Sequence, residues 1–561
     1  MQPLSFGNFS LLLVGVAFLW GCSKDPVVQP VIDRIEISGP NTVMRYHEVD
    51  LEATAYLSDG TVANHVTITW QSSRPDVATV NGNGKVTGIS AGTATITAVA
   101  ADVTADVEMV VTENPVTDIE INVPEQTVIS RRIPLQATIT MESGLTMSGP
   151  QLVSWSTTGP AQITDNALLA TDSGSVNITA TAGAVSRQKS IYVKAWEETE
   201  IDPYLAQPAA GAIKVVPVVI IRILPTADGI NIDATQDVQY GGGGEISIAD
   251  MKSRLLRFDK RIKFALEEGS RFRGYKTPSA PPYLGYKVVK YIDYYKPQPP
   301  NYSIITKVEA GKNVYSPHYF KMWQMFNMRD LVENQGVKEV WVWVNGTATP
   351  NFPNYDPNIH GNIPSVGGWE SNMAGPYGDV SNSDRKTNDM PVYNKTYIVY
   401  QQNTRRTHAE ALHNHGHQLE AQFSHINYYA FWGHFAGKWT GATPPYGRAG
   451  DTHFPPNATS DYDYNNTTLV LSDIEDWTPN ATGEKKLVNR DTWGNIPYNW
   501  PEADGLEQKV ESQWYIYWWQ NMPGYQNNIS WSATHKMSNW WEFVADWDGA
   551  KAAGKNLNQP K

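Results

Sequence analysis

The chain has 561 residues, of which 41% are hydrophobic and one is cysteine. Its length predicts roughly three to four domains, and its hydrophobic content is ample for folded cores. The net charge of −13 argues against nucleic acid or an anionic membrane surface as partner, and a single cysteine excludes a disulfide within the chain.

The N-terminus has the pattern of a secretion signal. Its apolar run at residues 11–20 (LLLVGVAFLW) is too short to span a membrane stably. Residues 19–22 (LWGC) resemble a bacterial lipoprotein lipobox, and residues 23–25 (SKD) resemble the surface-export signal of Bacteroidota lipoproteins. The resemblance implies a signal peptide at 1–21, lipidation of Cys22, and a location in the outer membrane facing the cell exterior. The alternative is an incidental cysteine in an uncleaved signal.

After a linker at 22–29, residues 30–112 and 115–194 form an internal repeat. Residues 35–37 (IEI) return unchanged as residues 119–121. Each unit alternates apolar and polar residues over short runs that Gly, Pro, Asn and Asp separate. This pattern predicts a small antiparallel β-sandwich for each unit.

Four segments of the first unit carry a family resemblance. They are residues 70–73 (WQSS), 77–80 (VATV), 84–88 (GKVTG) and 92–98 (GTATITA). Together they resemble the bacterial Ig-like group 2 (BIG2) domain. The second unit keeps residues 155–157 (WST) and 174–180 (GSVNITA) and is similar to a divergent member. The resemblance implies spacer or adhesion modules rather than catalysis.

The composition changes after an acidic linker at residues 196–202. Seventeen of the 20 tryptophans lie at or beyond Trp196. The glycine run 241–244 lacks the Lys and Ser/Thr of a phosphate loop, which favours a flexible loop. Apolar runs predict strands at 215–224, 337–344 and 397–400, and helical spacing predicts helices at 248–268, 328–335 and 510–520. The chain is therefore expected to have two N-terminal Ig-like β-sandwiches followed by one large α+β or mixed α/β domain at 203–561.

Residues 407–423 (THAEALHNHGHQLEAQF) predict a helix with one polar face. At about 100° per residue, Glu410, His413, His417 and Glu420 share an arc of roughly 80°. The two carboxylates are about 15 Å apart along the axis, so all four groups cannot bind one ion. We predict that His413 and His417 hold Zn²⁺ and that Glu410 or Glu420 is the general base.

The opposite side of this helix carries an apolar stripe that suits a protein core. His408 and His415 lie away from the polar cluster and are predicted to be bystanders. Gly416 stands in mid-helix, where glycine usually marks the close approach of another backbone. The alternative interpretation is a buried helix whose histidines only form hydrogen bonds with their neighbours.

Residues 413–417 (HNHGH) resemble the zincin metallopeptidase helix, whose motif is H-E-x-x-H. Both histidine positions match, but Asn414 replaces the Glu that acts as general base in that motif. Phe423 stands where the metzincin extension has a third histidine. The resemblance therefore implies a metal site more than a standard peptidase mechanism, and Glu410 is the nearest substitute base on the same face.

Other residues of the C-terminal region are also candidates. Glu370 lies in a polar loop beyond the strand at 337–344 and is a candidate acid or base. His453 and Asp461 are candidates for the third metal ligand. The acidic residues between 461 and 476 suit either a structural Ca²⁺ site or a solvated loop.

Three functions follow from these patterns. The first is a cell-surface lipoprotein whose zinc-dependent hydrolase domain acts on an extracellular carbohydrate or peptide polymer. The second is a surface glycan-binding lipoprotein without catalysis, because exposed indoles stack on sugars, although aromatics at helical spacing more often form a core. The third is a metal-free glycosidase that uses Glu370 with Glu410 or Glu420. In each, the lipid anchor is the sole membrane contact and nucleic acid is not a partner.

Overall fold

The computed structural model describes most of the chain from residue 29 onward. The described residues are 29–233, 246–296, 303–309, 312–317, 319–344, 347–348, 370–382, 390–404, 406–439, 442–502, 505 and 509–561. The signal peptide, Cys22, the linker up to residue 28 and the glycine run 241–244 lie outside these residues. Within the described part, no helix is both long and apolar enough to cross a membrane.

The first repeat consists of three small sheets. Their orders are β2-β9-β8-β5, β3-β7-β6 and β1-β4. The strands are β1 (Ile32–Ser38), β2 (Thr42–Met44), β3 (Glu48–Asp50), β4 (Glu52–Leu57), β5 (Thr69–Ser72), β6 (Ala78–Val80), β7 (Lys85–Gly88), β8 (Gly92–Ala100) and β9 (Val103–Thr112). Every second residue of β8 is buried, from Ala94 to Ala100. The apolar–polar alternation of the sequence therefore marks the inner face of this sandwich.

The second repeat has a corresponding set of sheets, in the orders β11-β19-β18-β15, β12-β17-β16 and β10-β13-β14. Its strands are β10 (Val116–Ile121), β11 (Gln126–Val128), β12 (Arg132–Pro134), β13 (Ala137–Met141), β14 (Thr146–Ser148), β15 (Ser154–Thr158), β16 (Ala161–Thr164), β17 (Ala167–Ala170), β18 (Gly174–Ala182) and β19 (Val185–Lys194). In each repeat a short strand pairs in parallel with the last long strand, as β2 does with β9 and β11 with β19. The predicted pair of β-sandwiches is confirmed.

The C-terminal region is built on a six-stranded mixed sheet with the order β20-β22-β21-β25-β28-β27. The strands are β20 (Glu197–Glu198), β21 (Lys214–Ile223), β22 (Leu284–Tyr294), β25 (Glu339–Trp343), β27 (Ser371–Ala374) and β28 (Tyr397–Gln402). The four central strands are parallel, and the two edge strands run antiparallel to their neighbours. The region is therefore mixed α/β, as the predicted strands and helices indicated.

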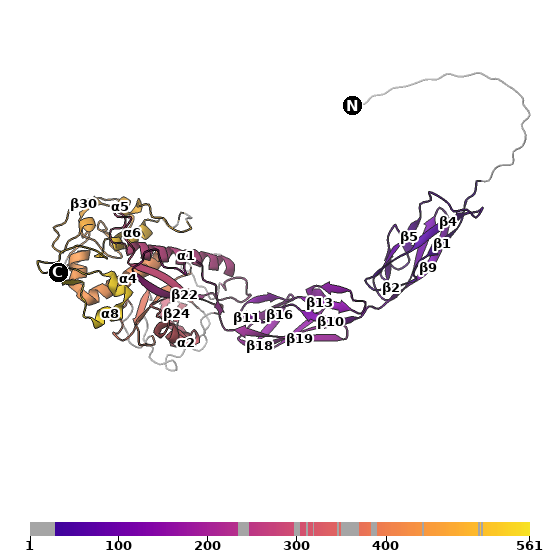
Figure 1. Cartoon of the computed structure of the whole chain (residues 1–561), viewed down its shortest axis with the longest axis horizontal. Coiled ribbons are helices and arrows are strands. Elements are labelled where there is room, and N and C mark those ends of the chain that lie inside the picture. The colour runs from indigo at the N-terminus through magenta and orange to yellow at the C-terminus, as the bar shows by residue number, and fades with distance from the viewer. Residues whose placement is uncertain are drawn as a thin grey trace, which may run out of the picture. The chain divides into compact units, whose positions relative to one another are not determined.

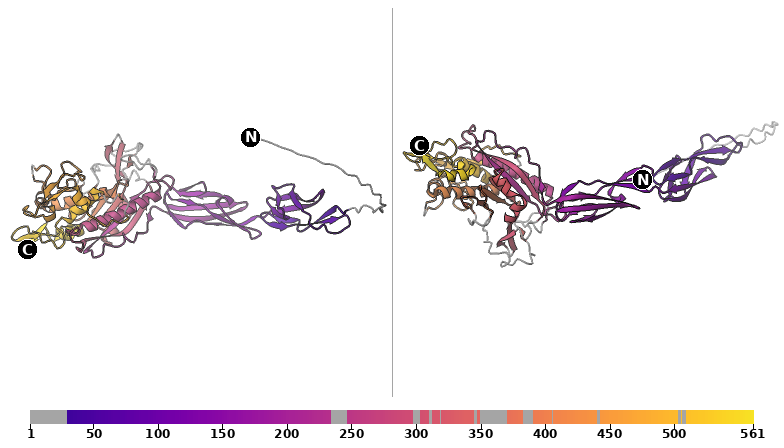
Figure 2. Two further views of the ribbon diagram at one scale, coloured as in Figure 1. Left: turned by 90° about the horizontal axis from the view of Figure 1, so that it is seen from above. Right: turned by 60° about the horizontal axis from the view of Figure 1, so that its bottom comes forward.

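Helices cover both faces of this sheet, which explains the continuous apolar runs of its central strands. Helix α1 (Ile248–Gly269) packs against β22 and against α4 (His408–Tyr428) and α6 (Val510–Gln520); it can be followed in Figures 1 and 2. Ile398 and Tyr400 of β28 belong to the same core as these helices. Tyr397 of β28 points to the opposite face of the sheet from Ile398 and Tyr400, because side chains alternate along a strand. On that face, Trp323 of helix α2 (Tyr319–Met325) donates a hydrogen bond to the Tyr397 hydroxyl.

Shorter elements complete the described part of this region. The helices are α3 (Met328–Glu333), the π-helix η3 (Tyr429–Ala436), η4 (Ile474–Asp476), α5 (Arg490–Gly494), α7 (Trp541–Ala545) and α8 (Trp547–Ala552), and a further short helix, η1 (Pro150–Leu152), lies in the second repeat. The strands are β23 (Ser303–Glu309), β24 (Lys312–Pro317), β26 (Thr347–Ala348), β29 (Val470–Ser472), β30 (Lys486–Val488), β31 (His535–Met537) and β32 (Asn558–Pro560).

A buried ion pair links the two longest strands of the sheet. The Arg222 guanidinium in β21 donates two hydrogen bonds to the Asp293 carboxylate in β22, at 2.6 and 2.9 Å. Both side chains are at most 2% exposed, and Lys252 of α1 lies 2.6 Å from the same carboxylate. Burial acts to raise the pKa of Asp293, but Arg222 and Lys252 outweigh it and lower the pKa. The carboxylate is therefore charged and compensates two cations.

We expect Asp293→Asn to destabilise the C-terminal region by about 3–5 kcal/mol, because it leaves Arg222 buried without its counter-charge. Tryptophan fluorescence during guanidinium unfolding measures this, since 17 of the 20 tryptophans lie from Trp196 onward. The control is Glu542→Gln, which removes the half-exposed partner of Lys555 and should cost less than about 1 kcal/mol. Equal losses in the two variants would contradict the prediction.

Candidate metal centre

Helix α4 presents two imidazoles side by side. Its apolar residues Leu412, Leu419 and Phe423 are buried in the core formed with the sheet and α6. This packing turns the opposite face of the helix away from the core. His413 and His417 are one turn apart on that face, and their Nε2 atoms are 3.1 Å apart.

A third imidazole comes from a loop 36 residues beyond His417. The Nε2 atom of His453 is 2.8 Å from that of His413 and 2.9 Å from that of His417. Among the described residues, these three histidines form the one group of three or more metal-ligand side chains whose atoms lie within 4.8 Å of one another. Of the two predicted third ligands, His453 joins the histidine pair and Asp461 does not.

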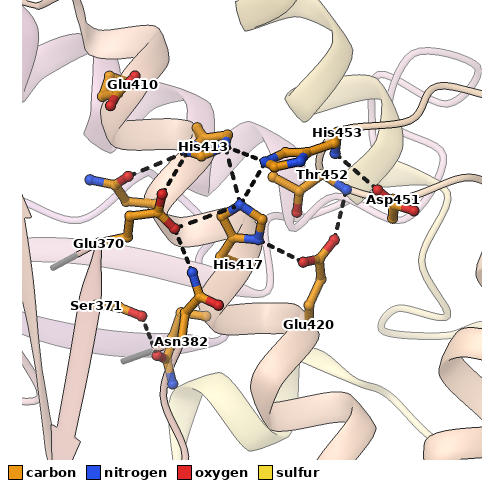
Figure 3. Close-up of polar contacts among 12 residues, drawn as sticks. Glu370, Ser371, Asn382, Glu410, His413, His417, Glu420, Asp451, Thr452 and His453 are labelled. Atoms are coloured by element: carbon orange, nitrogen blue, oxygen red, sulfur yellow. Dashed lines mark hydrogen bonds and ion pairs between the residues drawn. The ribbon is translucent and has the colours of Figure 1, made fainter. Parts of the chain in front are cut away.

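Carboxylates orient two of these rings through their other nitrogen (Figure 3 shows the polar contacts around His417). Glu420 accepts from His417 Nδ1 at 2.8 Å, and Asp461 accepts from His453 Nδ1 at 2.8 Å. Because a carboxylate only accepts, it holds the proton on Nδ1 and leaves a lone pair on Nε2. Asn414 Oδ1 lies 3.5 Å from His413 Nδ1 and favours the same tautomer there.

This arrangement fits a divalent metal ion. Three nitrogens bound to one tetrahedral zinc at about 2.0–2.1 Å lie roughly 3.3 Å apart, which is close to the spacing found here. Three converging lone pairs repel one another unless a cation or a proton lies between them. Imidazole nitrogen is also one of the ligands that zinc commonly binds in proteins.

The electrostatics keep two of the three imidazoles neutral. Burial, followed by the charges of His417 and His453, lowers the pKa of His413 to about 3. Burial, followed by the charge of His417, also lowers the pKa of His453. Burial acts to lower the pKa of His417, but the hydrogen bond and charge of Glu420, together with the charges of Glu370 and Asp451, outweigh burial and raise the pKa. Neutral imidazole is the form that binds a metal.

Gly416 allows the loop that carries His453 to lie against α4. A Cβ atom at this position would be 2.9 Å from Thr452 Oγ1 and 3.1 Å from Thr452 Cγ2. The sequence predicted the close approach of another backbone at this glycine, and the structure instead places a side chain, that of Thr452, against it. The other oxygen of Glu420 accepts from the Thr452 backbone N–H at 2.7 Å, so one carboxylate joins the helix, the loop and His417.

Further contacts hold the same loop. Asp451 accepts from the backbone N–H groups of His453 and Phe454, and Lys438 lies 2.6 Å from its second oxygen. Burial, followed by the charge of Glu420, raises the pKa of Asp451 to about 6. Tyr464 Oη donates to the Thr452 carbonyl at 2.9 Å. The position of His453 is thus fixed from both sides of the loop.

Glu370 lies beside the histidines because of the register of the sheet edge. Ser371 of β27 pairs with Tyr400 of β28, so Glu370 lies at the end of β28 that leads toward α4. Its Oε2 atom is 3.6 Å from His417 Nε2, and its Oε1 atom is 3.9 Å from His413 Nδ1. Asn382 donates to its Oε2. Burial is the largest cause of the raised pKa of Glu370, which suits a group that exchanges protons.

Glu410 is on the predicted face of α4 but has a different partner. Its carboxylate accepts from the Arg406 guanidinium at the start of the helix, and it contacts none of the three imidazoles. Glu420 lies next to them, yet its two oxygens are taken by His417 and Thr452. The three predicted carboxylates therefore occupy three different environments, and the sequence did not distinguish them.

His408 and His415 of α4 face away from the other two imidazoles of the helix, as predicted. His415 stacks on Tyr400 of β28 with ring centroids 3.6 Å apart, and its Nδ1 donates to Ala411 O. His408 is buried beside Phe258 and Ser512. Asn414, in the position of the zincin glutamate, donates to the Gln401 carbonyl at 3.0 Å. His415 and Asn414 thus attach the helix to the sheet, and His408 attaches it to α1 and α6.

The acidic and aromatic segments have structural contacts. Asp463 accepts from Thr459 N and Asn466 Nδ2, and Asp473 accepts from Arg448. A structural Ca²⁺ site there stays a prediction. The five aromatic residues of α6 are all fully buried, which favours the core interpretation over a sugar platform. Tyr462, within the acidic segment, is instead 53% exposed. Partial burial, followed by the charge of Glu370, raises its pKa.

Comparison with known proteins identifies the first repeat. Residues 43–111 match the family of bacterial Ig-like domains (group 2). No curated protein sequence matches the chain. The matched residues do not include the histidine site. The match therefore defines the class of the N-terminal module and says nothing about the chemistry of the C-terminal region.

Several solved structures are similar to part of the chain. One is the structure of domains 4 and 5 of the S-layer protein SbsC. The match is 18% identical, includes 29% of this chain and 98% of the SbsC chain, and has a TM-score of 0.18. The Yersinia pseudotuberculosis adhesin InvE is 10% identical and covers 31% of this chain, which spans 65% of InvE, with a TM-score of 0.18. A third is an intimin mutant from EHEC O157:H7. The match is 23% identical, includes 17% of this chain and 52% of the intimin chain, and has a TM-score of 0.13.

We expect Gly416→Ala to lower the affinity of the site for a divalent metal ion about tenfold, because the new methyl group displaces Thr452 and with it His453. Zinc titration against a competing chelator measures this. Gly494→Ala in α5 is the matched control, since its methyl group would make only an ordinary contact, 3.5 Å from Val510 Cγ2. Wild-type affinity in the Gly416 variant would contradict the role assigned to this contact.

Proposed function

We propose that residues 203–561 form a zinc-dependent hydrolase that acts on an extracellular carbohydrate or peptide polymer. The observation that carries this proposal is the convergence of three Nε2 atoms within 3.1 Å of one another. Two of these imidazoles are oriented by carboxylates, as metal-binding histidines usually are. The site also has a carboxylate, Glu370, beside the nitrogens and partly exposed to solvent.

Each residue has a distinct role in this proposal. His413, His417 and His453 would hold the ion, and Glu420 and Asp461 would orient His417 and His453. When bound, zinc would make a coordinated water acidic enough to ionise near neutral pH. The Glu370 carboxylate would accept the proton of that water and later deliver it to the leaving group.

Glu370 is a better candidate for the general base than the two carboxylates of α4. Glu410 is ion-paired with Arg406, and both oxygens of Glu420 are hydrogen-bonded. Asn414 cannot act as a base and is bonded to the sheet. The chain thus departs from the zincin pattern in the base and keeps the two helical histidines.

The alternative functions have less support. A two-carboxylate glycosidase needs two carboxyl groups free to act on one bond. The carboxylate of Glu410 is paired with Arg406, and that of Glu420 is bonded to His417 and Thr452. The indoles of α6 that suggested a glycan-binding surface, Trp514, Trp518 and Trp519, are fully buried, so such a surface would need other rings, such as the exposed Trp439. The glycosidase alternative predicts that the histidines bind no ion, and the glycan-binding alternative predicts binding of a sugar polymer without turnover.

The N-terminal part suits a protein held at a cell surface. We infer that Cys22 carries a lipid in the outer membrane and that the two Ig-like repeats are spacers on the exterior. The match of residues 43–111 to bacterial Ig-like domains supports an extracellular module. A large polymer outside the cell is the substrate that such a location favours.

We expect the purified wild-type chain to contain about one zinc ion, and the His413→Ala/His417→Ala variant to contain none while staying folded. Metal analysis by mass spectrometry, with circular dichroism for folding, measures this. His425→Ala is the matched control, because His425 is exposed on the same helix. A wild-type chain that binds no zinc when zinc is supplied would contradict the proposal.

We expect Glu370→Gln to lower the hydrolysis rate by about 10²–10⁴-fold without loss of zinc, because it removes a proton acceptor and keeps the shape of the side chain. Rates are measured on the peptide or polysaccharide found by screening extracellular polymers. Glu410→Gln, on the same side of the site but bonded to Arg406, is the control and should keep most of the activity. If the Glu410 variant loses the activity and the Glu370 variant keeps it, the assignment of the base is wrong.

A further inference from the structure

Tyr462 has an unusual position above the histidine site. Its ring lies against that of His453, with centroids 4.2 Å apart and planes inclined by 37°, and 5.6 Å from the ring of His413. The residue is nevertheless 53% exposed. It therefore covers two of the three imidazoles and faces solvent at the same time.

The backbone of Tyr462 is in the left-handed region, with φ of 58°. This conformation is uncommon for a bulky L-residue and costs roughly 1–2 kcal/mol. Such outliers persist where the surrounding structure fixes them, and they cluster at functional sites. The strain is therefore a reason to look for a role beyond packing.

The neighbours of Tyr462 hold it in this conformation. Asp461 is hydrogen-bonded to His453 Nδ1, and Asp463 accepts from the backbone N–H of Thr459. Tyr464 is buried and its hydroxyl bonds to the Thr452 carbonyl and to Tyr515. The ring of Tyr462 therefore lies between the histidines and solvent.

We propose that Tyr462 contacts the substrate and donates its phenol hydrogen bond to the substrate oxygen that gains negative charge during hydrolysis. This inference rests on the proposed function and adds that the substrate is an acyl compound, an amide or an ester. A protonated phenol is a hydrogen-bond donor at neutral pH. Donors aimed at a developing oxyanion give one of the largest contributions to acyl transfer.

The proposed step balances as follows. The water oxygen forms a bond to the carbonyl carbon, and the carbonyl π electrons move to its oxygen, which accepts from the Tyr462 hydroxyl. Glu370 takes one proton from the water. The C–N or C–O bond then breaks as the carbonyl re-forms, and Glu370 returns the proton to the leaving nitrogen or oxygen.

The test uses the full-length, zinc-loaded chain and Tyr462→Phe, which keeps the ring and removes the hydroxyl. The first probe is p-nitrophenyl acetate, an acyl substrate whose hydrolysis rate is measured. The second is acetohydroxamate, an oxygen-donor ligand whose affinity is measured by calorimetry. We expect kcat to fall about 100-fold with KM nearly unchanged, acetohydroxamate affinity to fall about tenfold, and zinc affinity to stay constant. Tyr46→Phe is the matched control, because Tyr46 is also an exposed tyrosine with positive φ but belongs to the first repeat.

The outcomes separate this inference from the proposed function. Unchanged kcat and unchanged acetohydroxamate affinity in Tyr462→Phe would overturn the inference and leave the metal site intact. A loss of zinc affinity in that variant would also overturn it, since the phenol would then bind the metal. A wild-type chain that takes up no zinc would overturn the proposed function and the role of Tyr462 with it. If p-nitrophenyl acetate is not hydrolysed by the wild type, the acetohydroxamate affinities decide.

Discussion

The histidine site depends on the close approach of residues 451–453 to helix α4 at Gly416. One face of a helix can supply two imidazoles to an ion, one turn apart, and the third must come from another segment. The absence of a side chain at Gly416 leaves the space that Thr452 occupies. Glu420 uses the same proximity, because one oxygen bonds to His417 and the other to the Thr452 backbone. A single contact thus fixes both the position of His453 and the orientation of His417.

The sheet adds the remaining chemical group to this helix and loop. In the zincin motif the metal ligands and the base share one helix, whereas here the position of the base is Asn414, bonded to the carbonyl of Gln401. The carboxylate nearest the three nitrogens is Glu370, which the pairing of β27 with β28 brings to the end of the sheet. In the proposed function, metal binding and proton transfer would therefore come from different elements, and the register of the sheet edge sets the distance between them.

Such a site is costly to hold without an ion. Converging lone pairs repel, and the carboxylates of Glu420 and Asp451 are buried beside one another, which raises the pKa of Asp451. The left-handed backbone of Tyr462 adds strain. The large core around α1, α4 and α6, with its fully buried indoles, supplies the stability that offsets these terms. Binding of an ion would remove the repulsion, so metal binding and stability should be coupled.

The sequence by itself determined the features that depend on local periodicity. Alternation marked the strands of both Ig-like repeats, apolar runs marked β21 and β25, and helical spacing marked α1 and the two faces of α4. It could not choose between His453 and Asp461 as the third ligand, nor separate the roles of Glu370, Glu410 and Glu420. Those choices depend on distances between segments far apart in the chain, such as the 36 residues between His417 and His453. Periodicity gives the face on which a side chain lies, and tertiary packing decides what that face meets.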